Sequence, residues 1–394
     1  MLAHVPFTAR LNGPSAVRGR PVVHRWRGRL DCVFEPQAAA DSWSDQLAQR
    51  AAQARQRHRQ ATDELRALIG AGALDLAEAS RRLTAEAENN LRAMLALAED
   101  QLSKGQGPAP GRYALFGLGK LGGAEMTLGS DLDLLFVYDP CDQDAEVAAA
   151  DYFGRLAQRL TQLVVTAPDW RVAYEVDFRL RPHGEDGPLA TSLSGLRHYL
   201  QSDAWPWELQ ALTRLRAVGG SEALADEVAA VGHQAIKQRC ARLDPRAEVA
   251  AMRALLEDER PAMHDWDLKR RPGGLIDVEF IAQALQLHSA RDGAPVIAAN
   301  TGDALARLEQ AGYLSTAQAK TLLSAWRLIS SLRQLQAVFN VTDLSLVKGA
   351  EKAAVERMLG LTPGALRTRL VTVCGRTQRL FDVLVRGVEQ RAAA

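Results

Sequence analysis

Two acidic residues separated by one position follow a glycine-serine turn in the middle of the chain. Asp131 and Asp133 stand in the run Gly129-Ser-Asp-Leu-Asp-Leu134. In an extended strand alternate side chains share a face, so both carboxylates point to one side while the intervening leucines face a core. Carboxylates side by side repel each other, and a hard divalent cation such as Mg²⁺ relieves that repulsion. The alternative interpretation is a solvated strand edge with two exposed acids.

A third carboxylate and two arginines stand at the end of a second predicted strand. Asp177 follows Glu175 at alternate spacing and would join the first two acids, and Arg179 and Arg181 come directly after it. Planar guanidinium groups suit phosphate oxygens, although both arginines could instead pair with the neighbouring acids. Carboxylates for metal, glycine-serine amides for phosphate and arginines for developing charge together indicate phosphoryl or nucleotidyl transfer. In a two-metal site, one ion activates the acceptor oxygen and the other steadies the leaving group.

A glycine-rich turn before this motif permits another interpretation. Gly117-Leu-Gly-Lys-Leu-Gly122 follows a predicted strand and matches G-x-G-x-x-G, and Asp139 ends the next strand, where a dinucleotide fold keeps its ribose-binding acid. This arrangement would make the protein an NAD-binding oxidoreductase. The interval between the turn and the next strand, however, is short for the helical crossover that parallel strands require.

Periodicity predicts the elements that position these residues. Apolar residues spaced by three and four predict an amphipathic helix over Asp75–Leu102, and glycines and prolines in 105–111 end it. Strands are predicted at 113–116, 132–138 and 172–177, with a helix over 145–165, which gives a small α/β unit. Beyond residue 220 helical stripes return, at 322–339 and 363–390.

Composition excludes several classes of protein. The chain has 394 residues, 47% hydrophobic and 24% charged, with net charge +1, which are globular values. Near-neutral charge argues against a nucleic-acid substrate. The four cysteines are far apart, so reduced thiols are expected. No apolar run approaches the roughly 20 residues that span a bilayer, so no membrane partner is predicted and the cytoplasm is the expected location.

Four motifs in order resemble one known family, the glutamine synthetase adenylyltransferases, which belong to the polymerase-β-type nucleotidyltransferase superfamily. The motifs are Gly117–Glu125 continued by Gly129–Asp133, Glu175–Pro182, Ala204–Leu212 and Arg271–Phe280. The resemblance implies an α+β nucleotidyltransferase fold. Together with the periodic patterns, it gives a small mixed-sheet nucleotidyltransferase domain at 105–240, preceded by a helical region at 42–104 and followed by an all-helical domain at 241–394. Residues 1–41 are expected to be irregular.

The resemblance also implies a reaction and its ligands. ATP would donate AMP to a tyrosine hydroxyl of glutamine synthetase and release pyrophosphate. Asp131 and Asp133 would hold two Mg²⁺ ions, with Asp177 completing the catalytic one and serving as the natural proton acceptor.

Other residues of the matching motifs would bind phosphate. Gly129 and Ser130 would hold the β- and γ-phosphates. Lys120 would either reach a phosphate or pair with Glu125. In the last motif, acidic residues after two glycines would begin a helix or help to close the site over the substrate.

Members of this family usually fuse two such units, one that adds AMP and one that removes it. Ala204–Leu212 is more similar to the adding half, so adenylylation is the prediction, with phosphorolytic removal of AMP giving ADP as the alternative. The partner expected from the resemblance is glutamine synthetase, together with a nitrogen-signalling regulatory protein of the full-length fusion. A polymerase acting on RNA or DNA and a regulatory remnant without catalysis are further alternatives, which the charge and the intact acids disfavour.

Overall fold

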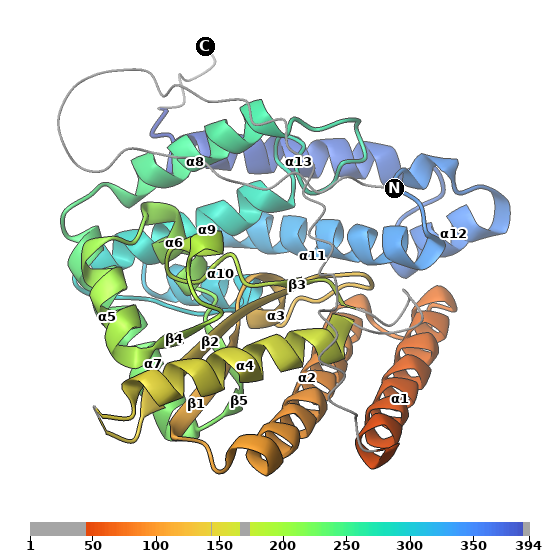
Figure 1. Ribbon diagram of the computed structural model, residues 1–394. Coiled ribbons are helices and arrows are strands. Elements are labelled where there is room, and N and C mark those ends of the chain that lie inside the picture. The colour runs from red at the N-terminus through yellow and green to blue at the C-terminus, as the bar shows by residue number, and fades with distance from the viewer. Residues whose placement is uncertain (1–44, 143, 166–173, 389–394) are drawn as a thin grey trace. The chain divides into compact units, whose positions relative to one another are not determined.

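Helices surround one small sheet in the part of the chain that is described (Figure 1). The computed structural model describes residues 45–142, 144–165 and 174–388. The expected irregular segment 1–41 and the first residues of the predicted strand 172–177 lie outside the described residues. The helical content and the sheet confirm the predicted α+β fold.

Helices lie before, between and after the strands. They are α1 (Asp45–Gly70), α2 (Leu76–Gln106), α3 (Gly119–Gly122), α4 (Glu146–Val165), α5 (Leu193–Ser202), α6 (Pro206–Leu212), α7 (Glu222–Cys240), α8 (Pro245–Glu259), α9 (Leu275–Arg291), α10 (Thr301–Gln310), α11 (Thr316–Phe339), α12 (Gly349–Met358) and α13 (Leu366–Leu384), with short 3₁₀ turns at Gly184–Asp186 and Leu344–Leu346. The strands are β1 (Gly111–Gly117), β2 (Leu132–Pro140), β3 (Val176–Asp177), β4 (Ala190–Ser192) and β5 (Arg216–Gly220).

The sheet is mixed, and its central pair is an antiparallel hairpin. β1 runs antiparallel to β2, with Gly117 opposite Leu134, and β5 is antiparallel to the other side of β1. β3 and β4 both pair in parallel with the free side of β2. A dinucleotide-binding unit requires parallel strands on either side of its glycine turn. The oxidoreductase interpretation of the glycine-rich turn is therefore wrong, because the strands flanking that turn run in opposite directions.

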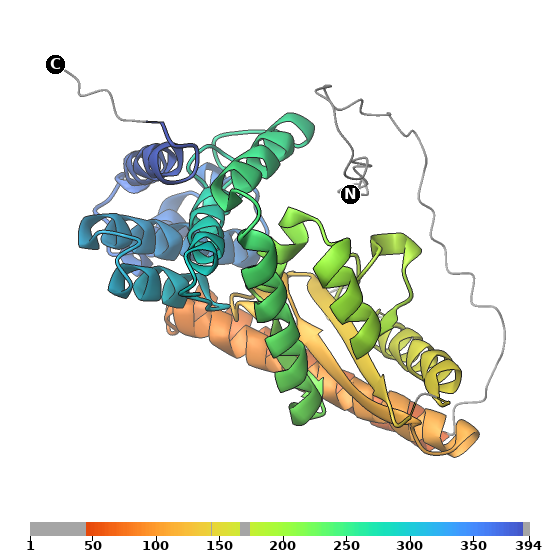
Figure 2. The same cartoon turned by 90° about the vertical axis from the view of Figure 1, so that its left-hand side faces the viewer.

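The long helix α2 forms for the reasons that its sequence gives. The Asp75 side chain accepts hydrogen bonds from the backbone amides of Ala77 and Glu78 and so caps the first turn. Its apolar stripe is buried along the helix, with Leu91 and Met94 fully inaccessible. The helix ends at Gly107, whose φ of 88° suits glycine. α2 packs on α1, α4 and β5 and so runs alongside the sheet (Figure 2).

The helices after residue 240 are built around α9. Its residues are buried on nearly all sides, as expected of a helix without a polar face. α9 contacts α8, α10, α11 and α13, and also α6 and α7 from the sheet-bearing part. The described residues from 45 onward form one compact unit. The structure therefore does not divide the chain near residues 104 and 240, and these two domain boundaries stay predictions.

Candidate active site

Strand pairing brings the predicted acids to one edge of the sheet. β2 and β3 are parallel neighbours in which Asp133 lies directly opposite Asp177. Adjacent strands are about 4.8 Å apart, and residues in register point to the same face. Asp131, two positions before Asp133, precedes β2, and the pairing is extended there by the Leu132 amide, which donates to the Glu175 carbonyl at 2.8 Å.

The charges of the three acids act on one another. Burial raises the pKa of Asp133 to about 7, and the negative charges of Asp131 and Asp177 contribute to that rise. The positive charges of Lys269 and Arg179 oppose it. Burial disfavours an ionised carboxylate, and two further anions disfavour it more. The site therefore concentrates negative charge where a divalent cation would be stabilised.

Asp177 is bound by its neighbour Arg179 in this structure. The Arg179 backbone amide donates to Asp177 Oδ1 at 2.7 Å, and its guanidinium donates to both carboxylate oxygens. Burial alone would raise the pKa of Asp177, but these hydrogen bonds and the charge of Arg179 bring it below its ordinary value. Within the described ranges, no three acidic, histidine or cysteine side chains are already grouped as metal ligands.

The glycine-rich turn serves the acid motif through close packing. Gly119 has φ of 51°, and a Cβ atom there would lie 1.9 Å from Asp133 Oδ2. A Cβ atom on Gly122 would lie 2.0 Å from the Arg214 carbonyl oxygen. The pattern of glycines is therefore required by the carboxylate and the backbone that press against the turn.

The glycine-serine turn before Asp131 is held by its own polar side chains. Ser130 Oγ accepts a hydrogen bond from the Thr127 amide at 2.9 Å, and Lys120 Nζ donates to it at 3.4 Å. Burial lowers the pKa of Lys120 well below its ordinary value, and the positive charges of Arg333 and Lys269 lower it further. The sequence predicts that Lys120 either reaches a phosphate or pairs with Glu125. In the structure its amino group lies beside Ser130, in the turn expected to bind phosphate.

Glu125 has other partners than the predicted lysine. Its carboxylate accepts a hydrogen bond from the Thr301 amide at 2.6 Å, at the start of α10, and lies 3.5 Å from Arg214 Nη1. Arg214 also lies 3.5 Å from Glu279 and donates to the Gly119 carbonyl at 3.2 Å. This buried network ties the glycine turn to the helical part of the chain. Sequence reasoning missed Arg214, and no local spacing connects it to partners about 90 positions away.

The predicted phosphate ligand Arg181 has a different environment. Its guanidinium donates to the carbonyl oxygens of Phe178, Glu185 and Gly187, at 2.9, 3.2 and 2.9 Å. The side chain is buried, and its hydrogen-bond partners within the described ranges are these carbonyl oxygens and no acid. Arg181 therefore holds together the loop that follows Asp177. Its expected role as a phosphate ligand stays a prediction.

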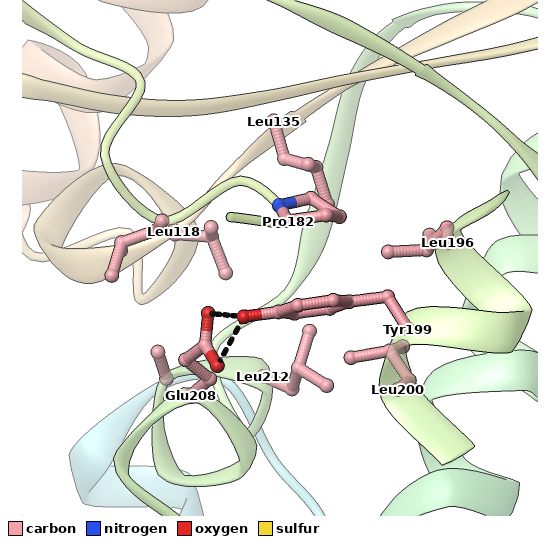
Figure 3. A pocket seen from close by; sticks show the side chains of 10 residues that line it. Leu118, Leu135, Pro182, Leu196, Tyr199, Leu200, Glu208 and Leu212 are labelled. Carbon is pink, nitrogen blue, oxygen red and sulfur yellow. Dashed lines mark hydrogen bonds between the residues drawn. The ribbon is translucent and has the colours of Figure 1, made fainter. Parts of the chain in front are cut away.

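The segment Ala204–Leu212 forms a buried support for that loop. Glu208 of α6 caps its own helix by accepting the Trp205 amide at 2.7 Å, and it also accepts the hydroxyl of Tyr199 from α5 at 2.8 Å. Both side chains point into a cavity lined by Leu118, Pro182 and other apolar residues (Figure 3). Its volume of about 10 Å³ holds about one water molecule. The cavity is therefore too small for a nucleotide.

The last predicted motif begins α9, and its two acids have separate roles. Asp277 is buried, and it accepts hydrogen bonds from the Gly273 amide and from Arg253. This contact confirms the helix-start interpretation for Asp277. Glu279, by contrast, faces the site: it pairs with Arg214, and its charge acts on Lys120.

A mixed sheet with an acidic edge between flanking helices is the architecture of an α+β nucleotidyltransferase domain. Comparison with protein families agrees with it. The family described as "Glutamate-ammonia ligase adenylyltransferase" matches residues 21–231, more than half of the chain, and the family described as "GlnD PII-uridylyltransferase" matches residues 242–385. The chain belongs to the glutamate-ammonia ligase adenylyltransferase family.

Similar proteins are named "Bifunctional glutamine synthetase adenylyltransferase/adenylyl-removing enzyme". The one from Caulobacter vibrioides is 39% identical over 294 residues, which cover 71% of this chain and 29% of that protein. The one from Mesorhizobium japonicum is 35% identical over 343 residues, which cover 82% of this chain and 34% of that protein. The chain thus spans about a third of the length of these curated relatives. In the described part of the chain, no helix is long and apolar enough to cross a membrane.

Proposed function

We propose that this chain transfers AMP from ATP to a tyrosine hydroxyl of glutamine synthetase, with release of pyrophosphate. The observation that carries the proposal is the strand register that places Asp133 opposite Asp177, two positions after Asp131. The charges of Asp131 and Asp177 accordingly help burial to raise the pKa of Asp133 to about 7. Such a site beside a glycine-serine turn is suited to a cation bound to phosphate. The names of the curated relatives support the choice of protein substrate.

We assign Asp131, Asp133 and Asp177 as ligands of two Mg²⁺ ions. The donor set fits, because all three are hard oxygen ligands and because burial and charge, and no hydrogen bond, dominate the shifted pKa of Asp133. When bound, the ions would neutralise the phosphates and lower the pKa of the attacking hydroxyl. Arg179 competes with a metal for Asp177, so metal binding requires this ion pair to loosen or to share the carboxylate.

The proposed reaction is an in-line displacement at the α-phosphorus of ATP. The tyrosine oxygen bonds to the α-phosphorus of ATP, and the bond from that phosphorus to the bridging oxygen breaks. Pyrophosphate leaves with the electron pair, and the phenolic proton passes to a base. Asp177 is the expected acceptor from its place in the motif, but its pairing with Arg179 keeps its pKa low. A low pKa favours its role as metal ligand over its role as base.

The chain's other residues bind and orient the nucleotide. Backbone amides around Gly129 and the Ser130 hydroxyl would hold the β- and γ-phosphates, whereas the Ser130 amide itself donates to the Thr127 carbonyl at 3.0 Å. Lys120 Nζ lies 3.4 Å from the Ser130 hydroxyl. Gly119 lets the Asp133 carboxylate lie directly against the turn. A nitrogen-signalling regulatory protein and a cytoplasmic location are further expectations for a member of this family.

Phosphorolytic removal of AMP, giving ADP, is the second candidate. The relatives carry both activities in their names, and the similarity of Ala204–Leu212 to the AMP-adding half favours addition. ATP labelled at the α-phosphate separates the two, because only the adding enzyme transfers label to glutamine synthetase. Release of ADP from adenylylated glutamine synthetase in the presence of phosphate would favour removal.

The experiment that tests the proposed function is a labelling assay with acid-to-amide variants. Asp131→Asn and Asp133→Asn are each expected to reduce labelling of glutamine synthetase at least 1,000-fold while the circular dichroism spectrum is retained, because both remove a ligand charge. The matched control is Asp151→Asn, an exposed acid on α4, which should label at the wild-type rate. Full labelling by either site variant would contradict the assignment.

A further inference from the structure

Basic side chains from three separate segments lie near enough to the acid motif for their charges to interact. Lys120 belongs to the glycine turn, Lys269 to the segment between α8 and α9, and Arg333 to α11. The charges of Lys269 and Arg333 both act on Lys120, and those of Asp131 and Glu279 act on it with the opposite sign. Like charges separate unless an anion holds them together. The repulsion among these three basic side chains must therefore be offset, either by acidic side chains of the protein or by a bound anion.

Arg333 has an unsatisfied donor at this position. Its Nη1 nitrogen is buried and has no hydrogen-bond partner among the described residues. The acids whose charges act on Arg333 are Glu279, Asp267 and Asp131. Glu279 pairs with Arg214 and Asp267 with Arg270, so both acids have another partner. A buried guanidinium nitrogen without a partner is costly to the folded protein, and it is retained most readily where a ligand supplies the acceptor.

Contacts of the next residue on α11 show that this part of the helix lies against the loop before Asp131. Gln334 accepts a hydrogen bond from the Leu128 amide at 3.1 Å and donates to the Met126 carbonyl at 3.4 Å. Gln334 therefore anchors α11 to the loop that carries Gly129 and Ser130, the predicted phosphate-binding turn. Two contacts thus join this turn to the basic residues: Lys120 donates to the Ser130 hydroxyl, and the turn of α11 that carries Arg333 is bonded to Leu128 through Gln334.

We propose that Arg333, together with Lys120 and Lys269, binds the terminal phosphates of ATP and the pyrophosphate that leaves. The inference rests on the proposed function and assigns the site's polyphosphate end. The negative charge of Asp131 acts on Arg333, whereas the positive charges that act on Asp177 are those of Arg179 and Arg181. In this assignment the cluster binds the terminal phosphates beside the Gly129–Ser130 turn, where Lys120 lies, and Asp177 is left to the α-phosphate and the attacking hydroxyl. Because the cluster draws on α11, the helical part of the chain completes the nucleotide site.

Calorimetric titration of Arg333→Gln with three probes tests this assignment. Affinity for magnesium-ATP and for magnesium-pyrophosphate should each fall about 10-fold or more, because a charge-assisted contact to phosphate is lost. Affinity for AMP, which has no terminal phosphates, should change less than 2-fold. Arg333→Lys should recover part of the loss. Arg327→Gln, at an exposed arginine of the same helix, should match the wild type with all three probes.

Thermal unfolding without nucleotide provides a second readout. A ligand-binding arginine with an unpartnered nitrogen adds no stability to the empty protein, so Arg333→Gln should unfold at or above the wild-type temperature. Unchanged affinity for both polyphosphates, or a variant that is destabilised or does not fold, would overturn the inference. Wild-type protein that binds magnesium-ATP and labels glutamine synthetase in the same experiment would show that only this inference, and not the proposed function, had failed.

Discussion

Replacing Asp133 by asparagine is expected to stabilise the metal-free protein at alkaline pH while it abolishes catalysis. The pKa of Asp133 is about 7 in the folded chain, against an ordinary value of 3.8 for an aspartate side chain. A carboxyl group with a raised pKa binds its proton more tightly in the folded state, so its contribution to stability falls as pH rises between these two values. The difference corresponds to about 4 kcal/mol above pH 7. Asparagine is neutral at every pH and removes this loss.

Scanning calorimetry of both proteins in the presence of EDTA measures the effect. Asp133→Asn should exceed the wild type by about 1.5 kcal/mol at pH 5 and by about 4 kcal/mol at pH 8, since the loss grows by about 1.4 kcal/mol per pH unit. At pH 8 this is a rise of about 5 °C in melting temperature for a chain of this size. The exposed-acid control Asp151→Asn should show no such pH dependence. A variant no more stable than the wild type at pH 8, or a gain that is equal at pH 5 and pH 8, would refute the reasoning.

Three further substitutions test the parts that support the site. Gly119→Ala should reduce labelling at least 100-fold, because the new methyl group meets the acid motif and φ is positive, whereas Gly154→Ala in the middle of α4 should leave the rate unchanged. Arg181→Lys should lower the unfolding free energy, measured in urea, by about 2 to 4 kcal/mol, because three carbonyl oxygens share its guanidinium; an unchanged midpoint would contradict its structural role. Tyr199→Phe should cost about 1 to 3 kcal/mol in the same assay, because buried Glu208 loses a donor; no loss would mean that water replaces the hydroxyl.

Local patterns predicted the elements that form the sheet and its flanking helices. The predicted strands at 113–116 and 132–138 lie within β1 and β2, and the predicted helix over 145–165 agrees with α4 to one residue. The helix predicted over Asp75–Leu102 continues to Gln106, because the first glycine of the loop is accommodated in its last turn and Gly107 ends it. Alternation and helical stripes reveal these elements since both depend on one buried face.

The long-range contacts at the site could not be predicted from the sequence. The acid spacing predicted that Asp131 and Asp133 share a face, and the strand register is consistent with the third acid lying beside them. Nothing in the motif indicated that Arg181 would donate hydrogen bonds to three backbone carbonyls, or that Arg214 would bind the glycine turn. Arg333 lies about 200 positions from the acid motif and has no local pattern of its own. Such residues act through the fold and are visible only when helices distant in the chain pack together.

A crystal structure of the protein with Mg²⁺ and a non-hydrolysable ATP analogue is the most direct test of the central claim. We predict that carboxylate oxygens of Asp131, Asp133 and Asp177 lie about 2.0 to 2.1 Å from magnesium, with the Arg179 pair opened or shared. The polyphosphate should lie between these ions and Arg333. Nucleotide bound elsewhere, or Asp177 still held only by Arg179 while magnesium and nucleotide occupy the site, would contradict the account.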